Sequence, residues 1–378
     1  MFASYGDRHG RQRALVIGIV LMALITAGMG LLPGYDSIGW LAPILLLALR
    51  AGQGAAVGGE QGGSAAFVLE HAPADRRGWY GGWQYATVGL GLGAGLAAGA
   101  ILSSTLSASA LQTWGWRVAF LVALPLGVVG LYVRLRLEET PDFRAVQRRG
   151  TLSSTPLGET LRTSTRQVII GFGVVATVSL TFNVFFVFLP NFVATTGRVA
   201  LPRALAGALL GLLFASILAP VFGRLTDRVG RRPVVAAGVL ALMVLTVPAY
   251  WLIERGSSSQ VVIGYLAIGV GLGAAGLSTF LAELFPTRLR YSGLSLTYGL
   301  ASAVFGGSAP LIATVLVQQT GNALLPAWYA AGVSVVAFGC ALLAPETAPG
   351  ARSASRLGQA PSASSRRDIR AQGANETT

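Results

Sequence analysis

Long apolar stretches alternate with short polar stretches along most of the chain. Ten segments of 20–29 residues are predominantly apolar, and runs such as 14–32 are apolar on all faces. The segments lie at 14–33, 41–69, 79–102, 116–136, 167–195, 203–225, 233–253, 260–284, 291–317 and 323–344. About 20 consecutive apolar residues cross a bilayer as a helix, whereas barrel strands alternate polar and apolar positions over about 10 residues. The pattern therefore predicts an all-α membrane protein with ten crossings.

Three polar stretches flank or interrupt these segments. Residues 1–13 are basic, residues 137–165 combine charged side chains with a Ser/Thr run, and residues 345–378 are rich in Ser, Ala, Arg and Gly. We interpret them as a cytoplasmic start, a central cytoplasmic linker and a disordered cytoplasmic tail. The linker then separates an incomplete N-terminal bundle of four helices, 1–136, from a six-helix bundle, 166–344.

Composition and charge support this topology. The 378 residues are 53% hydrophobic and 11% charged, against about 25% charged residues in soluble domains, which excludes a soluble globular protein. All 28 basic residues are arginine, and with a cytoplasmic N-terminus 23 of them fall in cytoplasmic segments. This bias explains the net charge of +13 without a nucleic-acid partner. It predicts a multi-pass inner-membrane protein with both termini in the cytoplasm.

Residues that would support metal or nucleotide chemistry are sparse. The single cysteine, Cys340, lies in an apolar segment, and His9 and His71 lie at helix ends, so we expect no metal site. The Gly-rich run 89–93 lies inside an apolar segment, where close helix packing explains it better than a phosphate loop. With no catalytic constellation either, the sequence predicts neither an enzyme nor a cofactor or nucleotide site.

Two polar motifs occur twice, in the same order. Residues 6–13 match 226–233 in Asp, Arg, Gly and Arg, at an offset of 220. Glu70 and Arg77, with three neighbours, match Glu283 and Arg290 at an offset of 213. Two predicted helices separate the motifs in each copy, which indicates a duplicated helical unit in parallel orientation. In the second copy two predicted helices precede the Asp-Arg-x-Gly-Arg motif, whereas in the first copy none does. The sequence therefore looks like ten helices of a design with six helices in each half.

These motifs resemble signatures of the major facilitator superfamily. Residues 223–232 match the pattern Gly-x-x-x-Asp-Arg-x-Gly-Arg-Arg, and residues 50–54 match Arg-x-x-Gln-Gly. The runs 58–63, 70–78 and 283–293 resemble the metabolite:proton symporter family in particular. The resemblance implies a major facilitator fold of two six-helix bundles, with about ten of the twelve transmembrane helices present.

The resemblance also implies a function. Members of that family carry small polar metabolites, organic acids or betaine-like osmolytes, across the inner membrane by alternating access with proton symport. The alternative is an N-terminally truncated remnant that does not transport, because the family's first helix lines the cavity and supplies acidic residues.

Polar side chains in the second apolar segment are candidates for a substrate and proton pathway. Arg50, Gln53, Glu60 and Gln61 fall, with Ser64, in one arc of about 100° on a helix. An ionisable group in the bilayer costs at least about 2.5–3.5 kcal/mol, so such groups usually face a water-filled cavity or a partner. A structural network that pairs Arg50 with a neighbouring helix is the alternative.

Asn183 is a further candidate for this pathway, because its segment would line the cavity in the family fold. An aromatic packing stripe of Phe182, Phe185 and Phe186 that tolerates one amide explains the residue equally well.

A second set of charged residues lies in or beside the short cytoplasmic loops. By resemblance these residues form a gate that closes the cytoplasmic side, with Glu70 and Arg77, and Glu283 and Arg290, in the same charge networks. The alternative is a topology signal only. As exposed ion pairs, each would contribute about 0–1 kcal/mol. The set comprises Asp7, Arg8, Arg11, Glu70, Arg77, Asp227, Arg228, Arg231, Arg232, Glu283 and Arg290.

Overall fold

The computed structural model describes residues 2–348, and this part of the chain is helical with no strand. The predicted tail begins at residue 345. Its first four residues are ordered against the bundle, which corrects that boundary, and the remainder lies outside the described residues.

The N-terminal half contains the helices that precede the linker. They are α1 (Phe2–His9), α2 (Arg11–Leu31), α3 (Tyr35–Ile38), α4 (Leu41–His71), α5 (Arg77–Thr105), α6 (Ala108–Ala110), η1 (Leu111–Gly115), α7 (Trp116–Leu121) and α8 (Ala123–Arg136). The linker that follows forms two short helices, α9 (Pro141–Arg148) and α10 (Pro156–Thr163).

The C-terminal half contains the remaining helices, several of which are interrupted. They are α11 (Thr165–Phe182), η2 (Asn183–Phe188), α12 (Leu189–Thr195), α13 (Leu201–Val229), α14 (Arg231–Arg255), α15 (Ser258–Ala275), α16 (Ser278–Leu284), η3 (Thr287–Leu289), α17 (Arg290–Ala301), η4 (Ser302–Gly307), α18 (Ala309–Thr320) and α19 (Leu325–Leu343).

All ten predicted apolar segments are helical to within a few residues of their predicted ends. Within residues 2–348, nine helices are long and apolar enough to cross a membrane: α2, α4, η1–α8, α11–α12, α13, α14, α15–α16, η3–α18 and α19. The remaining predicted segment, 79–102, lies in α5, whose 29 residues pack along α13. At 1.5 Å per residue, α5 is about 43 Å long, enough to span a bilayer.

Local sequence signals account for where several helices begin and end. The Thr140 side chain accepts the backbone N–H of Phe143 and so caps α9. Ser257 and Gln260 form a capping box at the start of α15. Gly321 ends α18 in the left-handed conformation, with φ of 67°, which a glycine adopts without steric cost.

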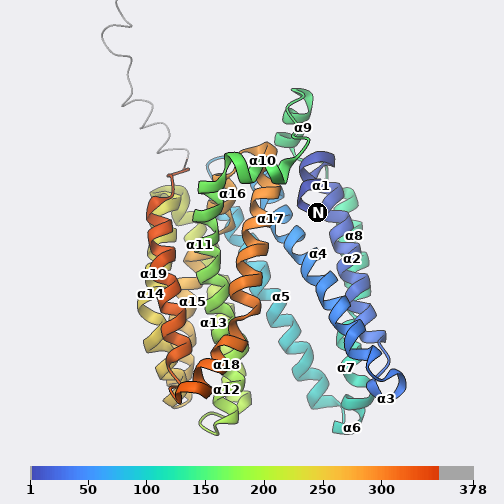
Figure 1. Ribbon diagram of the computed structural model, residues 1–378, viewed down its shortest axis with the longest axis vertical. Helices are drawn as coiled ribbons and strands as arrows, with labels where there is room; N and C mark the ends of the chain where they lie inside the picture. The colour runs from blue at the N-terminus through green and yellow to red at the C-terminus, as the bar shows by residue number, and fades with distance from the viewer. Residues whose placement is uncertain (1, 349–378) are drawn as a thin grey trace, which may run out of the picture.

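The loops that carry most arginines gather at one end of the molecule. In Figure 1, α1, the linker helices α9 and α10, and α16 lie at the upper end, and α3, α6 and α12 lie at the opposite end. We call the upper end the arginine-rich end. This separation agrees with the alternation of loops that the sequence predicts.

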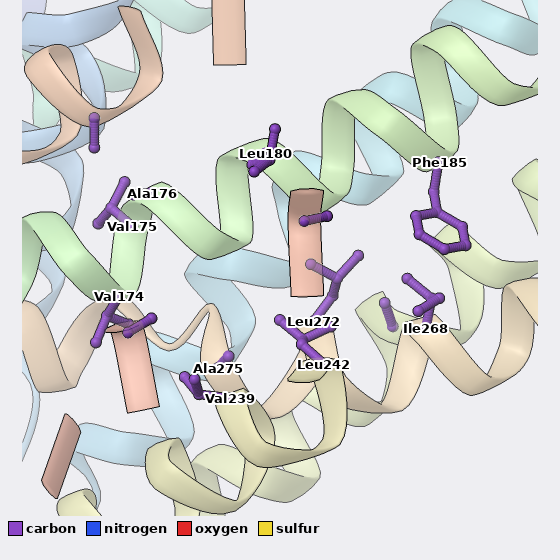
Figure 2. Packing of buried hydrophobic residues seen from close by; sticks show 14 of the residues in the cluster. Val174, Val175, Ala176, Leu180, Phe185, Val239, Leu242, Ile268, Leu272 and Ala275 are labelled. Carbon is purple, nitrogen blue, oxygen red and sulfur yellow. The ribbon is translucent and has the colours of Figure 1, made fainter. Parts of the chain in front are cut away.

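The largest buried apolar cluster lies in the C-terminal half, around α11 and η2. Of the apolar window in α11–α12, 61% is buried, whereas none of the window in η1–α8 is. The outer helices therefore present apolar side chains outward, as lipid-facing helices do. Figure 2 shows side chains of α11, η2, α14 and α15 that fill the cluster, among them Val174, Leu180, Phe185, Val239, Leu242, Ile268 and Leu272.

Small residues let the two halves approach closely along α5 and α13. A Cβ atom built on Gly223 would lie 2.2 Å from the carbonyl oxygen of Gly78, and one on Gly78 would lie 2.2 Å from that of Gly223. A Cβ on Gly82 would lie 2.4 Å from the carbonyl oxygen of Ala219. Backbone contact of this kind is typical of helices that pack through small residues in lipid.

Candidate functional site

A buried charge cluster lies at the arginine-rich end of the N-terminal half. Arg11, at the start of α2, places Nη1 2.6 Å from Asp7 Oδ1 and Nη2 3.4 Å from Glu70 Oε1. All three side chains are 0% exposed. Because buried ions must be paired, this geometry links the ends of α1, α2 and α4.

The same arrangement recurs in the C-terminal half. Arg231, at the start of α14, places Nη1 2.7 Å from Asp227 Oδ1 and Nε 3.2 Å from Glu283 Oε2. Each arginine also donates through Nη1 to a backbone carbonyl five residues earlier, Gly6 for Arg11 and Thr226 for Arg231. The sequence repeat is therefore also a repeat of side-chain geometry.

A third repeated element, Glu-Thr, completes each cluster and was not among the predicted gate residues. Glu139 accepts the Arg11 backbone N–H at 3.0 Å, and Glu346 accepts that of Arg231 at 2.8 Å. The threonine that follows each glutamate donates at 2.5 Å to Glu70 or Glu283. The signal that could have revealed it is the dipeptide 139–140, which recurs at 346–347 after the last helix of the second half.

The turn before each arginine requires glycine. Gly10 has φ of 114° and Gly230 has φ of 119°, values that L side chains rarely adopt. A Cβ atom on Gly10 would also lie 2.2 Å from Glu139 Oε2. Glycine thus lets the carboxylate approach the first N–H groups of the helix, where the helix dipole favours negative charge.

The two aspartates reach across to the other half of the molecule. Asp7 accepts the backbone N–H of Ser292 at 2.8 Å, near the start of α17. Asp227 accepts the N–H groups of Gly78 and Trp79 at 2.8 and 2.9 Å, at the start of α5. Each aspartate thus joins an arginine in its own half to a helix N-terminus in the other half.

Two further contacts cross between the halves. Arg290, on α17, places Nη1 2.8 Å from Glu70 Oε1 on α4. Arg11 donates through Nη2 to the carbonyl oxygen of Thr287 at 2.6 Å. Burial raises the pKa of the Asp7 carboxyl above its ordinary value, while Arg11 and the Ser292 N–H act in the opposite direction.

These contacts correct two expectations. The pairs were expected to be exposed and weak, but they are buried, because the helix ends converge on them and exclude water. Glu70 pairs with Arg11 and Arg290 instead of Arg77, and Glu283 pairs with Arg231. Arg77 is partly buried at the start of α5, and its Nε has no hydrogen-bond partner in residues 2–348.

The other predicted gate residues lie at the edge of the clusters. Arg8 is exposed and donates to the carbonyl oxygen of Ser154 in the linker. Arg228 is exposed beside the start of α5, and Arg232 is exposed while its backbone N–H binds Glu346 at 3.1 Å. These three arginines are therefore accessible to solvent, unlike Arg11 and Arg231.

Beside the N-terminal cluster, α4, α5 and α8 surround a polar cavity of about 320 Å³, and Arg134, which lines it, contacts the start of α2 through Gln12 and Leu15. Glu60, Gln61 and Ser64 line it from α4, and Gln84 donates to Ser64 across it at 3.2 Å. Arg134 of α8 forms an ion pair with Glu60. Arg134 was not among the predicted pathway residues, because its position near the end of the apolar segment 116–136 does not show which way the side chain extends.

Arg50 and Gln53 are separate from this cavity. Arg50 is exposed and donates to Gln53 Oε1 at 3.0 Å, and Gln53 donates to Thr26 of α2 at 3.2 Å. The predicted polar stripe of α4 is therefore divided into an outer pair, Arg50 and Gln53, and an inner group around Glu60.

Asn183 lies in the C-terminal half, at the first residue of the π-helical turn η2. Its Nδ2 donates to the carbonyl oxygen of Ser179 in the same helix at 2.9 Å. A second π-helical turn, η4, packs nearby, and a Cβ on Gly306 would lie 3.1 Å from Asn183 Nδ2. Such turns are frequent at functional sites, although Phe182 and Phe186 also stack beside this one.

Comparison with known sequences agrees with this architecture. The sequence profile of the Major Facilitator Superfamily matches residues 1–215 and 172–374. The glycine betaine/proline/ectoine/pipecolic acid transporter OusA of Dickeya dadantii (strain 3937) is 34% identical over 363 residues, which cover 92% of this chain and 71% of OusA. The proline/betaine transporter of Escherichia coli (strain K12) is 35% identical over 363 residues with the same coverage. The ectoine/proline transporter ProP of Corynebacterium glutamicum is 36% identical over 356 residues, 89% of this chain and 70% of ProP.

Solved structures show a similar fold. The proton:xylose symporter XylE bound to 6-bromo-6-deoxy-D-glucose superposes with a TM-score of 0.71 at 19% sequence identity, covering 92% of this chain and 82% of that chain. The partially occluded inward open form of XylE from E. coli gives a TM-score of 0.66 at 18% identity, with coverages of 92% and 84%.

Proposed function

Because this chain belongs to the major facilitator superfamily and is a multi-pass membrane protein, we propose that it carries a betaine- or proline-like solute into the cell by alternating access. Transporters named for proline, betaine or ectoine at 34–36% identity support this solute class. We further propose that a proton moves with the solute, which makes the protein a secondary active symporter.

The observation that carries the proposal is the duplicated charge cluster. In this conformation Asp7 and Asp227 bind helix N-termini of the opposite half, and Arg290 pairs with Glu70. Rocking of the halves about a central site requires contacts that form at one end and break in turn. The predicted gate residues therefore act as a cytoplasmic latch, centred on Arg11 and Arg231 and extended by Arg8, Arg77, Arg228 and Arg232.

The same geometry suggests a role for each part of the chain. Residues 1–136 and 166–344 act as the two moving bundles, and 137–165 connects them. Glu60 and Gln61 lie in the polar cavity and form part of the solute and proton pathway, together with Arg50, Gln53 and Asn183. Glu60 is the one carboxylate among the residues that line this cavity, and a carboxylate can carry a proton.

Transport in proteoliposomes tests this function. With an inward-directed proton gradient, we expect glycine betaine or proline to accumulate above its external concentration, and a protonophore to abolish the accumulation. The measurement is uptake of radiolabelled solute, with liposomes that lack protein as the control. Uptake that equilibrates but never accumulates would contradict symport, and no uptake of any zwitterionic osmolyte would contradict the solute class.

Cysteine labelling tests the topology. In a Cys340→Ser background we expect a cysteine at Arg149, in the linker, to be protected from a membrane-impermeant maleimide in intact cells. A cysteine at Asp36, at the opposite end, should react. Both positions are exposed in the fold, so burial does not explain a difference. Reaction at 149 and protection at 36 would reverse the proposed orientation.

A further inference from the structure

The ion pair between Glu60 and Arg134 differs from those of the latch. It lies in the cavity among α4, α5 and α8, and its side chains remain 28% and 17% exposed, whereas Arg11 and Asp7 are 0% exposed. The polar side chains around it are neutral, since the remaining polar lining is Gln61, Ser64, Gln84 and Thr87. The cavity therefore presents one positive and one negative group, with no net charge.

Both members of the pair keep hydrogen-bonding capacity. Glu60 Oε1 accepts from Arg134 Nη2, and Arg134 Nη1 donates to the carbonyl oxygen of Leu15. Among residues 2–348 the other Glu60 oxygen accepts no hydrogen bond from the protein. A carboxylate offers about four acceptor sites and a guanidinium five N–H donors, so each group can bind a second partner.

We infer that Glu60 and Arg134 select zwitterionic solutes by binding both charges at once. This inference rests on the proposed function. The solute carboxylate lies against Arg134 and its ammonium group against Glu60, antiparallel to the protein pair, so that each charge has an opposite neighbour. Arg134 donates charge-assisted hydrogen bonds to the solute carboxylate, and Coulomb attraction holds the ammonium group, which in glycine betaine has no N–H to donate, beside Glu60.

The same geometry rejects solutes of a single charge. An anion would satisfy Arg134 but face the Glu60 carboxylate, and a cation would face the Arg134 guanidinium. Like charges placed together without solvent oppose binding. The cavity of about 320 Å³ suits a small solute and lies at the lower end of the size range of ligand pockets.

Three solutes of similar shape separate these effects. Glycine betaine is the zwitterion, 3,3-dimethylbutanoate is its anionic carbon isostere, and choline is a cation with the same trimethylammonium head. We expect competition with labelled glycine betaine in counterflow, which needs no proton gradient, to be at least tenfold weaker for both singly charged compounds than for unlabelled betaine.

Charge removal should change the preference predictably. In Glu60→Gln, betaine exchange should fall at least tenfold and binding of 3,3-dimethylbutanoate should rise. In Arg134→Gln, betaine exchange should fall similarly and binding of choline should rise. The matched control is Arg136→Gln. Arg136 lies two residues further along α8, on about the opposite side of the helix, where it is exposed and lies over the ring of Tyr132, so this variant should behave as wild type.

The gain of a new competitor distinguishes selection from misfolding, which would remove binding of every solute. Competition is measured by protection of a purified variant against thermal unfolding as well as by counterflow. If both variants retain the wild-type order of the three solutes, or if neither gains its singly charged competitor, the inference is wrong. If wild type exchanges no zwitterion at all but accumulates another solute, the proposed function itself fails.

Discussion

Substitution of Arg11 by glutamine is expected to open the arginine-rich end of the molecule. The change removes the cation that the buried Asp7 and Glu70 carboxylates share, so that Glu70 keeps only Arg290, and it removes the bond to the Thr287 carbonyl of the other half. Removing one member of a buried ion pair costs about 3–5 kcal/mol. A cost of that size corresponds to roughly two to four orders of magnitude in the population of the closed arrangement.

The measurement is the distance between spin labels at His9 and Pro286, which lie at exposed positions of opposite halves. In wild type a single short distance is expected, and in Arg11→Gln a longer component and a lower midpoint of thermal unfolding. The control is Arg13→Gln, two residues further along the same helix, where the side chain is exposed. Surface substitutions usually change stability by no more than about 0.5 kcal/mol. If the two variants cannot be told apart, Arg11 does not hold the latch.

Substitution of Gly223 by alanine is expected to prevent the same closure by a steric route. The added Cβ would lie 2.2 Å from the carbonyl oxygen of Gly78 and 2.9 Å from the Gly78 carbonyl carbon. These are backbone atoms, so neither can rotate away, and α5 and α13 must separate instead. Separation pulls Asp227 from the N–H groups of Gly78 and Trp79. Loss of hydrogen bonds to a charged acceptor adds about 1.5–3 kcal/mol to the steric cost.

Gly91→Ala in α5 is the matched control, because nothing lies within 4 Å of the position its Cβ would take. Alanine favours a helix over glycine by about 1 kcal/mol, so this variant should be neutral or slightly more stable. Spin labels at Asp75 and Leu225, both exposed, report the separation of α5 and α13. A Gly223→Ala distance equal to that of wild type and Gly91→Ala would show that the helices do not meet as described.

The repeated residues form buried ion pairs, which the loop sequences alone do not reveal. Each cluster places an arginine between an aspartate, a glutamate and a second glutamate from the segment after the last helix of its half. Such a cluster stabilises one conformation while it is intact. If a single member is withdrawn, the partner that stays behind is a buried charge without a counter-ion.

Much of the architecture was predictable because its signals are local. The lengths of the apolar segments match the thickness of a bilayer, and the arginine content predicted which loops gather at the same end of the molecule. The duplication was visible because Asp, Gly and Arg are required at fixed positions in each turn, as the φ values of Gly10 and Gly230 show. The glutamates at 139 and 346 were not predicted, because a repeat of two residues is too short to stand out in a sequence. It became evident only when both were found to accept the backbone N–H of the equivalent arginine, Arg11 or Arg231.

The sequence by itself determined that this protein is a helical membrane protein of duplicated design, because hydropathy and charge act on each segment independently of its neighbours. The tertiary structure alone decided which charges pair. Arg134 and Glu60 are 74 residues apart, and Arg290 and Glu70 are 220 apart. Whether a carboxylate meets an arginine of its own half, a helix N-terminus or an arginine of the other half depends on how the helices converge. Burial at that convergence excludes water from pairs that the loop sequences alone would leave exposed.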